Sequence, residues 1–541
     1  MNVQPQRRPF DRVGAHNAMP LSFPAFLGRF GALTAIQSAA MPVLLSGDDA
    51  LIIAPAASGK TEAVMAPLCQ RLSQDRPEAG RVGILYIVPT RALANDIEIR
   101  IHEPLSSMRM SIQVRTGDHP RPVGDRRLDV LVTTPESFDS LMCRVPAAFQ
   151  GLRALVVDEA HLVDNTARGD QLRILVRRVL MRKTSRRPQL VAMSATVGDP
   201  EGLAGRLFGG VQQIIADTNA RPMDAVVVES LNEALADLRA DGLTKAIIFC
   251  NTRRRTEQTA AEAVKIGPWP AERIMVHHAS LPRREREDVE KAFRYWETGL
   301  MVCTSTMELG VDIGDVDAVV LADPPDSVAS LQQRVGRGCR RRSGMRAVFI
   351  AADQASRSAV SGLMADVDAR HIPVTDYDPD ISVIVQQTFS LLFEHARGLP
   401  RRAIKRLLEV LADGQTIDLV LDHLRSEGFL EEGASEILRA SPKLMDMGAA
   451  GRIHSNIADA GTVKVVDSGT GRVVGMLSRG TVEGRSVTIG GRSWMVTSSA
   501  SGAVSVKASA ASDHESGTFF GGSGGNGAFW KYLPPELRGT T

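Results

Sequence analysis

The sequence predicts a multidomain α/β protein in which two parallel-sheet domains precede a winged-helix domain and a small β-rich domain. Three observations predict this order. Up to about residue 372, short apolar runs alternate with stretches of helical spacing, as in a doubly wound sheet. From there to about residue 445 helical spacing prevails, and beyond it apolar and polar residues alternate between glycine turns. With 541 residues, the chain is long enough for several cores.

The domain boundaries follow from these changes of pattern. We expect a flexible N-terminus over 1–20, a first α/β domain over 21–222, a second over 223–372, a winged-helix domain over 373–445, a β-rich domain over 446–510 and a Gly-rich tail over 511–541. Arg221-Pro222 marks a linker between the α/β domains. In the second α/β domain, apolar runs predict strands at 246–249, 300–303, 318–321 and 347–350.

The winged-helix region shows two amphipathic helices. Their apolar faces are Ile404, Leu407, Leu408 and Leu411, then Ile417, Val420, Leu421 and Leu424, with Gly428 as a C-cap. Such a domain can read a major groove or brace a neighbouring domain, and we favour bracing. In the β-rich region, Trp494 either packs in a core, which we favour, or stacks a base. Phe529-Trp530, beyond the glycines, is expected to dock back.

The string Ala54-Pro-Ala-Ala-Ser-Gly-Lys-Thr61 follows the apolar run Leu51-Ile-Ile53 and predicts a phosphate-binding loop. Ala57, Ser58 and Gly59 would present backbone N–H groups to phosphates at the start of a helix. Lys60 would reach the β- and γ-phosphates, and the Thr61 hydroxyl would bind Mg²⁺. Ala54 departs from the usual first glycine. Taken alone, such a string is also compatible with a surface turn.

Asp158-Glu-Ala-His161 follows a second apolar run, Ala154-Leu-Val-Val157. Asp158 at the carboxyl end of a strand can hold Mg²⁺, and Glu159 is placed to orient or deprotonate the attacking water. A lone acidic pair is usually solvated, but the two strings in this order predict a nucleoside-triphosphate hydrolase with ATP and Mg²⁺ as cofactors.

Further strings resemble the motifs of superfamily 2 DEAD/DEAH-box helicases, in the order that this family has them. They are Pro89-Thr-Arg-Ala-Leu93, Thr116-Gly-Asp118, Thr134-Pro-Glu-Ser137, Ser194-Ala-Thr196, Phe249-Cys-Asn-Thr252, Thr304 to Asp312, and Gln333 to Arg340. Phe30 and Gln37 resemble the adenine-reading Q motif, and a glutamine amide can both donate to and accept from adenine. The resemblance implies two tandem RecA-like domains that close on ATP.

By this resemblance, the second domain completes the ATP site. Arg337 and Arg340 would stabilise the charge on the γ-phosphate as arginine fingers, and Asp312 would contact the ribose. Cys339 replaces the second glycine of the motif, and Arg340 also belongs to a basic run that can be solvated. Arg91, Thr116, Thr134 and Thr304 are candidates for contacts to a nucleic-acid backbone, although each alone would pass as a cap or turn residue.

Other strings resemble the Lhr (large helicase-related) group of this superfamily. They are Arg168-Gly-Asp-Gln-Leu172, His277 to Arg286, Glu308 to Asp317, Asp378 to Gln387, Ile453-His-Ser-Asn-Ile457, Thr470 to Gly475 and Gly490 to Trp494. Ala279 stands where the group usually has glycine. Members usually carry a longer domain beyond the β-rich region, whereas this chain stops at Thr541, so it resembles a form shortened at the C-terminus.

Composition bears on the cellular compartment of the protein and on how it would bind nucleic acid. The formal net charge is only +2, so nucleic acid must be bound by local grooves. The five cysteines are scattered without a C-x-x-C, which argues against a thiol metal site and favours reduced core residues. The N-terminus lacks the apolar core of a signal peptide and no long apolar run occurs, so we expect a cytoplasmic protein without membrane contact.

The resemblance implies an ATP-dependent helicase that moves 3′ to 5′ on single-stranded DNA and unwinds DNA or RNA–DNA hybrids in genome repair. Single-stranded or forked nucleic acid is the expected partner, DNA rather than RNA. An alternative is an ATPase stimulated by nucleic acid that remodels or translocates without separating strands, as a subunit of an antiviral defence complex; the short C-terminus motivates it. A non-catalytic scaffold is the third hypothesis, and intact Lys60, Asp158, Glu159 and Arg337 argue against it.

Overall fold

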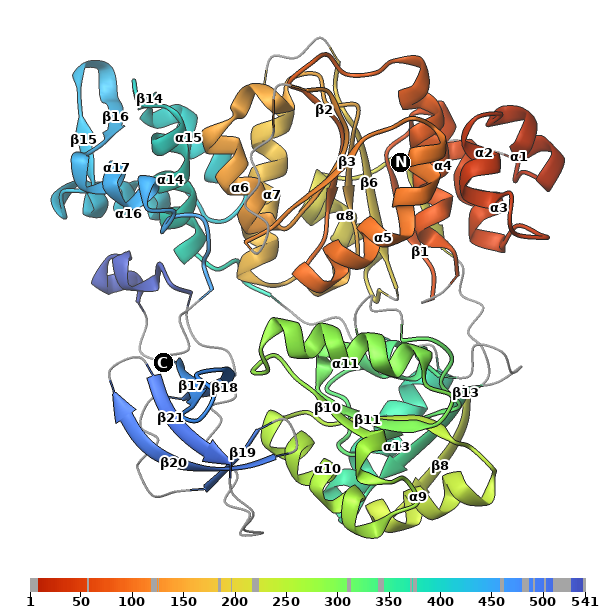
Figure 1. Ribbon diagram of the computed structural model, residues 1–541. Helices are drawn as coiled ribbons and strands as arrows, with labels where there is room; N and C mark the ends of the chain where they lie inside the picture. Colours follow the sequence, from red (N-terminus) through yellow and green to blue (C-terminus); the bar gives the residue numbers. More distant parts are fainter. Residues whose placement is uncertain are drawn as a thin grey trace. The chain divides into compact units, whose positions relative to one another are not determined.

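The computed structural model describes residues 8–55, 58–117, 124, 126–182, 186–195, 197–216, 223–308, 313–338, 345–369, 372, 377–457, 462–478, 486–489, 492–500, 503–508 and 527–538. They belong to two compact units, each built from separate stretches of the chain. The first unit combines Met1–Thr218 with Pro373–Ala458 and Gly525–Thr541; the second combines Asn219–Ile372 with Asp459–Gly524. Figure 1 traces the chain through both.

The first unit is built on a parallel sheet whose described strands have the order β3-β4-β2-β5-β6-β1-β7. The strands are β1 (Ala50–Ile53), β2 (Val82–Ile87), β3 (Ile112–Arg115), β4 (Leu128–Thr133), β5 (Ala154–Val157), β6 (Gln189–Ser194) and β7 (Gln213–Ala216). The apolar runs before the phosphate loop and the acidic pair are β1 and β5, as predicted.

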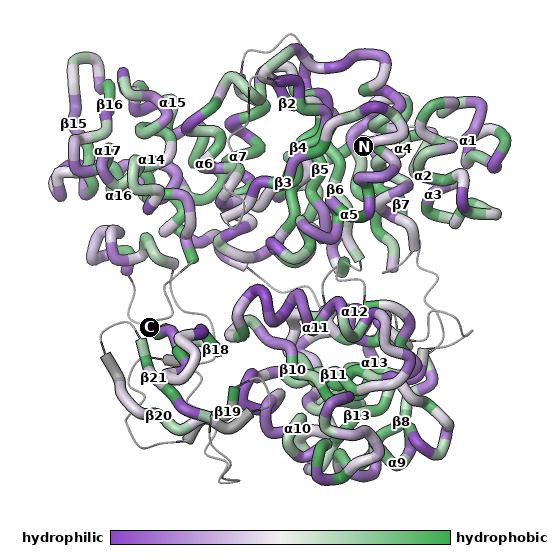
Figure 2. Tube along the Cα trace, in the orientation of Figure 1, coloured by the Kyte–Doolittle hydropathy of each residue, from purple (hydrophilic) through white to green (hydrophobic). Residues whose placement is uncertain are grey.

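Helices cover both faces of this sheet, because successive side chains of each strand point to opposite sides. Ala50 and Ile52 of β1 belong to one apolar core, and Leu51 and Ile53 to the other. The first core is covered by α3 (Ala35–Ser46), α4 (Lys60–Gln74) and α5 (Arg91–Ser107), and the second by α6 (Pro135–Arg144), α7 (Ala167–Leu180) and α8 (Pro200–Phe208). In Figure 2 the strands between these layers are mainly hydrophobic.

The N-terminal segment is ordered where the structure describes it, so the expected flexibility of residues 1–20 is wrong for residues 12–20. Helix α1 (Arg12–Ala18) is capped by Asp11, whose side chain accepts from the Gly14 N–H at 2.6 Å, and α2 (Ser22–Leu27) follows. Ala15 and Met19, four residues apart, are fully buried in the first core. Ala15 and Met19 thus form a small apolar face that attaches the N-terminal segment to the first core. The polar composition of the segment gave no sign of this face.

The second unit contains another parallel sheet, with the described order β10-β11-β9-β12-β13-β8. Its strands are β8 (Met223–Val228), β9 (Lys245–Phe249), β10 (Ile274–His277), β11 (Gly299–Cys303), β12 (Ala318–Leu321) and β13 (Met345–Ile350). Its helices are α9 (Leu231–Ala240), α10 (Arg253–Ile266), α11 (Arg283–Tyr295), α12 (Val328–Val335) and α13 (Gln354–Asp368). The four strands predicted for this domain are β9, β11, β12 and β13.

The winged-helix domain belongs to the first unit. It comprises α14 (Ser382–Glu394), β14 (Leu399–Pro400), α15 (Arg401–Leu408), α16 (Gly414–Ser426), β15 (Leu430–Glu432), β16 (Ile437–Ala440) and α17 (Pro442–Ala449). The predicted apolar faces of α15 and α16 form its core, and Gly428 ends α16 with φ 72°. Helix α14 packs on α6 and α7, and Ile174 of α7 lies in the winged-helix core. The domain therefore braces the first sheet domain through α14.

The β-rich domain belongs to the second unit and begins later than predicted. Its strands β17 (Thr462–Asp467), β18 (Val473–Ser478), β19 (Ser486–Ile489), β20 (Arg492–Ala500) and β21 (Ala503–Ala508) pair in the order β18-β17-β21-β20-β19. The predicted start at residue 446 is wrong, because α17 continues to Ala449 and Ile453 lies in the winged-helix core. Trp494 is buried and its indole N–H donates to the Ile489 carbonyl at 3.3 Å, so it is a core residue.

The last described segment, 527–538, returns to the winged-helix domain. Phe529 and Leu533 are buried in its core, and the Phe529 ring lies 6.0 Å from that of Phe389 in α14. Docking of Phe529 is confirmed, so this part of the predicted Gly-rich tail is folded against the winged-helix domain. The linker Arg221-Pro222 lies outside the described residues. Among the described helices, none combines the length and apolarity needed to cross a membrane.

Candidate nucleotide and nucleic-acid site

The phosphate loop lies between β1 and α4. Gly59 adopts φ 85°, a backbone that favours glycine, and α4 begins at Lys60 directly after it. The Lys60 ammonium is buried, donates to the Ala54 carbonyl at 2.7 Å and lies 4.0 Å from the Glu159 carboxylate. Ala57 lies outside the described residues. The first α4 amides and Lys60 make this helix start an anion site.

The Q-motif residues contact this loop directly. Thr34 and Gln37 form a reciprocal capping box at the start of α3, and the Thr34 hydroxyl donates to the Ser58 carbonyl at 2.8 Å. The Gln37 amide donates to the Gly59 carbonyl at 3.4 Å. Phe30 is exposed, with the Arg29 guanidinium 4.9 Å from its ring centre. The structure thus brings Gln37 to the phosphate loop; its predicted contact with adenine stays a prediction.

Asp158 and Glu159 follow β5, beside Lys60. Both Asp158 oxygens are held: one accepts from the Tyr86 hydroxyl at 2.7 Å, and the other from the Glu159 N–H at 2.9 Å. Burial, together with the neighbouring Glu159 carboxylate, raises the pKa of Asp158 to about 6. Glu159 has φ 43°, which is unusual for a non-glycine residue. A buried acid, Asp158, and a partly buried one, Glu159, beside a single lysine form a site that favours an added cation.

His161 joins the acidic turn to β6. Its Nδ1 lies 2.9 Å from the Ser194 hydroxyl, the first residue of Ser194-Ala-Thr196, and 3.7 Å from the Glu159 carboxylate. Burial lowers the pKa of His161, which favours the neutral ring. The turn that carries Glu159 is therefore tied to the next strand of the sheet, whereas Thr196 lies outside the described residues.

Two neighbours of the site were not identified from the sequence. Tyr86 lies within an apolar strand and carries no signal of its own. Arg100, in the middle of α5, donates to the Thr61 hydroxyl at 3.3 Å and pairs with Glu62 at 3.2 Å. An arginine on the polar face of a helix reads as a solvated charge, so only the packing of α5 against α4 reveals this contact.

The donors present fit a magnesium ion. The Thr61 hydroxyl and the Asp158 carboxylate are hard oxygen ligands. A divalent cation would offset the burial and the repulsion from Glu159 that together raise the pKa of Asp158. No sulfur or imidazole ligand is needed. Thr61 and Asp158 would hold the ion, and the nucleotide phosphates and water would complete its coordination.

Three predicted nucleic-acid contacts lie at the carboxyl ends of neighbouring strands. Arg91, Thr116 and Thr134 follow β2, β3 and β4, which are adjacent in the order β3-β4-β2. The Arg91 guanidinium packs on Gly117, where a β-carbon would lie 2.7 Å from it. Thr134 caps α6 by accepting from the Ser137 N–H at 3.5 Å. The predicted ATP-binding loops follow β1 and β5, so both sets line one edge of the sheet.

The second unit holds the remaining described candidates. Thr304 follows β11; its N–H donates to the His277 carbonyl at 3.2 Å and its hydroxyl lies 3.3 Å from that of Thr306. Arg337 follows α12, is largely buried and donates to the Glu308 carbonyl at 2.5 Å. Arg334, beside it, pairs with the Glu308 carboxylate at 2.6 Å. Asp312 and Arg340 lie outside the described residues. The roles of Arg337 and Thr304 stay predictions.

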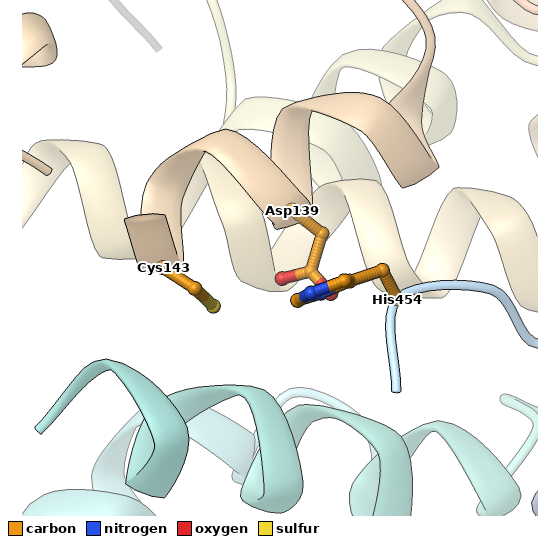
Figure 3. A group of neighbouring side chains, drawn as sticks. All are labelled: Asp139, Cys143 and His454. Atoms are coloured by element: carbon orange, nitrogen blue, oxygen red, sulfur yellow. The ribbon is translucent and has the colours of Figure 1, made fainter. Parts of the chain in front are cut away.

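A separate cluster of metal-binding residue types lies between α6, α14 and the segment after α17. Asp139, Cys143 and His454 offer ligand atoms within 4.8 Å of one another (Figure 3). However, the Arg178 guanidinium lies 2.9 Å from the Asp139 carboxylate and 3.8 Å from the Cys143 sulfur. Burial raises the pKa of Cys143 to about 12, which keeps the thiol protonated. Arg178 already supplies the positive charge, so this cluster is an ion-pair joint.

The Arg178 joint connects the first sheet domain to the winged-helix domain. Arg178 of α7 also pairs with Glu394 of α14 at 2.6 Å and donates to Ser390 at 2.9 Å. The Ser390 hydroxyl donates to Asp139 at 2.5 Å. A buried guanidinium shared by carboxylates of α6 and α14 fixes the two helices in register.

Comparison with known proteins identifies both sheet domains. Residues 34–202 match the DEAD/DEAH box helicase family, and residues 227–342 match the helicase conserved C-terminal domain. The chain is 29% identical over 404 residues to the ATP-dependent helicase Lhr-Core of Saccharolobus solfataricus, covering 66% of this chain and 46% of that protein. It is 29% identical over 392 residues to the Lhr helicase/probable uracil glycosylase of Mycolicibacterium smegmatis, covering 60% and 26%.

Solved structures resemble the chain over a longer stretch. The structure of Mycobacterium smegmatis helicase Lhr bound to single-stranded DNA and AMP-PNP matches with a TM-score of 0.72 and 26% identity, covering 84% of this chain and 64% of that one. The DUF1998 helicase MrfA bound to DNA shares the fold, with a TM-score of 0.75 and 20% identity over 91% of this chain and 69% of that one. The chain spans about half the length of the Lhr-Core protein, 46%.

Proposed function

Because this chain belongs to the Lhr group of superfamily 2 DEAD/DEAH-box helicases, we propose that it hydrolyses ATP to move 3′ to 5′ along single-stranded DNA. One observation carries the proposal. The first sheet presents phosphate-binding and acidic loops after β1 and β5, and strand-gripping candidates after β2, β3 and β4, along the same edge. Hydrolysis at one half of that edge can therefore alter the grip at the other half.

The nucleotide would be held mainly by the first unit. The α4 amides and Lys60 bind the phosphates, Gln37 and Phe30 contact adenine, and Glu159 orients the attacking water. When bound, Mg²⁺ supplies positive charge at the β- and γ-phosphates. From the second unit, Asp312 would contact the ribose, while Arg337 and Arg340 would stabilise the transferring phosphoryl group, an effect worth about 10³–10⁵ in rate.

Nucleic acid would be gripped through its backbone. Hydroxyls and a guanidinium from Arg91, Thr116, Thr134 and Thr304 suit phosphate contacts, which carry no sequence information. A relative solved with single-stranded DNA supports DNA as a track. ATP and the strand favour the same closed state, so each should tighten binding of the other. Unwinding of DNA or RNA–DNA hybrids in repair is the use we propose for this movement.

A set of parallel assays tests the proposal. ATP turnover is measured with single-stranded DNA, single-stranded RNA and duplex, and strand release is followed on forked duplexes with opposite overhang polarity. We expect stimulation by single-stranded DNA and release only from the fork with a 3′ overhang. Turnover without release would instead favour a remodelling ATPase, and absence of turnover with every substrate would contradict the motor.

Replacing Glu159 tests the catalytic assignment. Glu159→Gln keeps the shape of the side chain but removes the charge that orients water, so we expect ATP turnover to fall by about 10²–10⁴-fold. Binding of a fluorescent ATP analogue should persist, because Lys60 and the α4 amides are unchanged. Glu201→Gln, an exposed residue in the first turn of α8, is the control. Wild-type turnover in Glu159→Gln would show that another group activates the water.

A further inference from the structure

The string Arg168-Gly-Asp-Gln171 at the start of α7 makes contacts that the mechanism above does not use. Thr166 caps the helix by accepting from the Gly169 N–H at 3.1 Å. A β-carbon on Gly169 would lie 2.0 Å from the Val163 carbonyl, so only glycine allows this approach. The helix start is therefore packed tightly against the end of the turn that carries Glu159.

Arg168 reaches from this helix start to two neighbouring loops. Its Nε and Nη2 donate to the two oxygens of Glu136 at 2.6 and 3.2 Å, as a bidentate pair. Its Nη2 also donates to the Pro89 carbonyl at 2.7 Å. Pro89 stands two residues before Arg91, and Glu136 two residues after Thr134. One guanidinium thus joins the segment after β2 to the first turn of α6, which follows β4.

Charge gives this contact a second consequence. Glu136 lies in the first turn of α6, beside the hydroxyl that would contact a phosphate, and its side chain is only 17% exposed. An unpaired carboxylate there would repel a nucleic-acid backbone. Arg168 neutralises it through a pair with fixed geometry, which a lysine could not reproduce.

We propose that Arg168 is a positioning residue for the nucleic-acid strand. It fixes the spacing between the loops that carry Arg91 and Thr134, and it cancels the negative charge of Glu136 beside them. The inference rests on the proposed function, because it assumes that these two loops grip a strand. It assigns to Arg168 no contact with nucleic acid.

The test is a double-mutant cycle on strand affinity. Fluorescence anisotropy with labelled single-stranded DNA is measured for Arg168→Gln, Glu136→Gln and the double variant at several salt concentrations. We expect Arg168→Gln to weaken binding about tenfold, as for loss of a charged hydrogen-bonded pair. Glu136→Gln alone should have a smaller effect, and adding it to Arg168→Gln should restore part of the affinity, since the repelling charge is gone.

A direct phosphate contact by Arg168 gives a different result and would overturn the inference. In that case Arg168→Gln would reduce the slope of log affinity against log salt by about one, and Glu136→Gln would not rescue it. We expect an unchanged slope and rescue. Arg168→Lys keeps the positive charge but cannot form the bidentate pair with Glu136, so it should bind single-stranded DNA with intermediate affinity. Full wild-type affinity in this variant would contradict the positioning role.

Two controls separate the inference from folding and from the proposed function. Arg173→Gln changes a similarly buried arginine on the same helix, which contacts Asp170 at 3.1 Å and the Arg206 carbonyl at 2.9 Å, and should leave strand affinity unchanged. Affinity for a fluorescent ATP analogue should be unchanged in Arg168→Gln. A wild type that binds no single strand would overturn both proposals, whereas equal binding by Arg168→Gln would overturn only this one.

Discussion

Gly59 combines a left-handed backbone, φ 85°, with close packing, because a β-carbon there would lie 2.3 Å from the Gln37 amide nitrogen. The left-handed conformation alone costs a non-glycine residue about 1–2 kcal/mol. Alanine at this position must therefore displace Gln37 or change the loop. Either outcome would disturb the loop that we propose to bind the phosphates.

We expect Gly59→Ala to weaken binding of a fluorescent ATP analogue by about tenfold or more, given this backbone cost and the added clash. The measurement is a fluorescence titration without nucleic acid. Gly205→Ala is the control, since nothing lies within 4 Å of its β-carbon position in α8. Equal ATP affinity in the two variants would show that the loop tolerates a side chain.

The sequence predicts the residues of the site better than their partners. Lys60, Thr61, Asp158 and Glu159 follow predictable strands in strings whose spacing reflects local backbone requirements, and the structure brings them together. Tyr86 contacts Asp158 from 72 residues away, which no local pattern records. The same limit hides Arg100, whose contact with Thr61 depends on how two helices pack.

At the scale of elements, α7 serves as the support of the first unit. Its first turn contacts the acidic turn and the loops after β2 and β4, and its last turns contact the winged-helix domain through Arg178. Gln171, between them, donates to the His454 carbonyl at 2.9 Å. One helix, α7, thus contacts the acidic turn, the segments after β2 and β4, and the winged-helix domain. Arg178 and Glu394 are 216 residues apart, so the sequence predicted the winged-helix fold and its bracing role but not the joint.

We expect Arg178→Met to loosen the joint by about 3–5 kcal/mol, because it leaves Asp139 and Glu394 buried without their partner. Hydrogen exchange of α14, measured by mass spectrometry, should increase. Arg177→Met is the matched control: its pair with Glu409, at 3.1 Å, is exposed and should contribute about 0–1 kcal/mol. Unchanged exchange of α14 in Arg178→Met would contradict the joint.

At the scale of the molecule, sequence order and spatial units differ. The first sheet domain shares its unit with the winged-helix domain and the last segment, and the second sheet domain shares its unit with the β-rich domain. Val463, Val465 and Trp494 of the β-rich domain belong to the same apolar core as β9 and β11 of the second sheet. Composition changes mark domains along a chain, but they carry no information about which domains pack together.

The docked last segment provides a test at this scale. Phe529→Ala removes a ring that is only 2% exposed in the winged-helix core, so we expect a loss of about 3–5 kcal/mol in the stability of that core. Thermal unfolding and hydrogen exchange of α14 and α16 check this, with exchange of β20 and β21 expected to stay unchanged. Leu419→Ala, at an exposed position of α16, is the control. Wild-type stability of Phe529→Ala would indicate that the segment adds nothing to the core.

The Arg178 joint also bears on how the gene can be dissected. A fragment cut after residue 372 contains both helicase family matches and looks like a minimal enzyme. It would nevertheless expose Ile174 to water and remove Glu394, the ion-pair partner of Arg178. The surface of α7 would then carry an exposed apolar side chain and an arginine without this carboxylate. Poor solubility or low turnover in such a fragment would then report damage from the cut, and would say nothing about the chemistry that the intact polypeptide can perform.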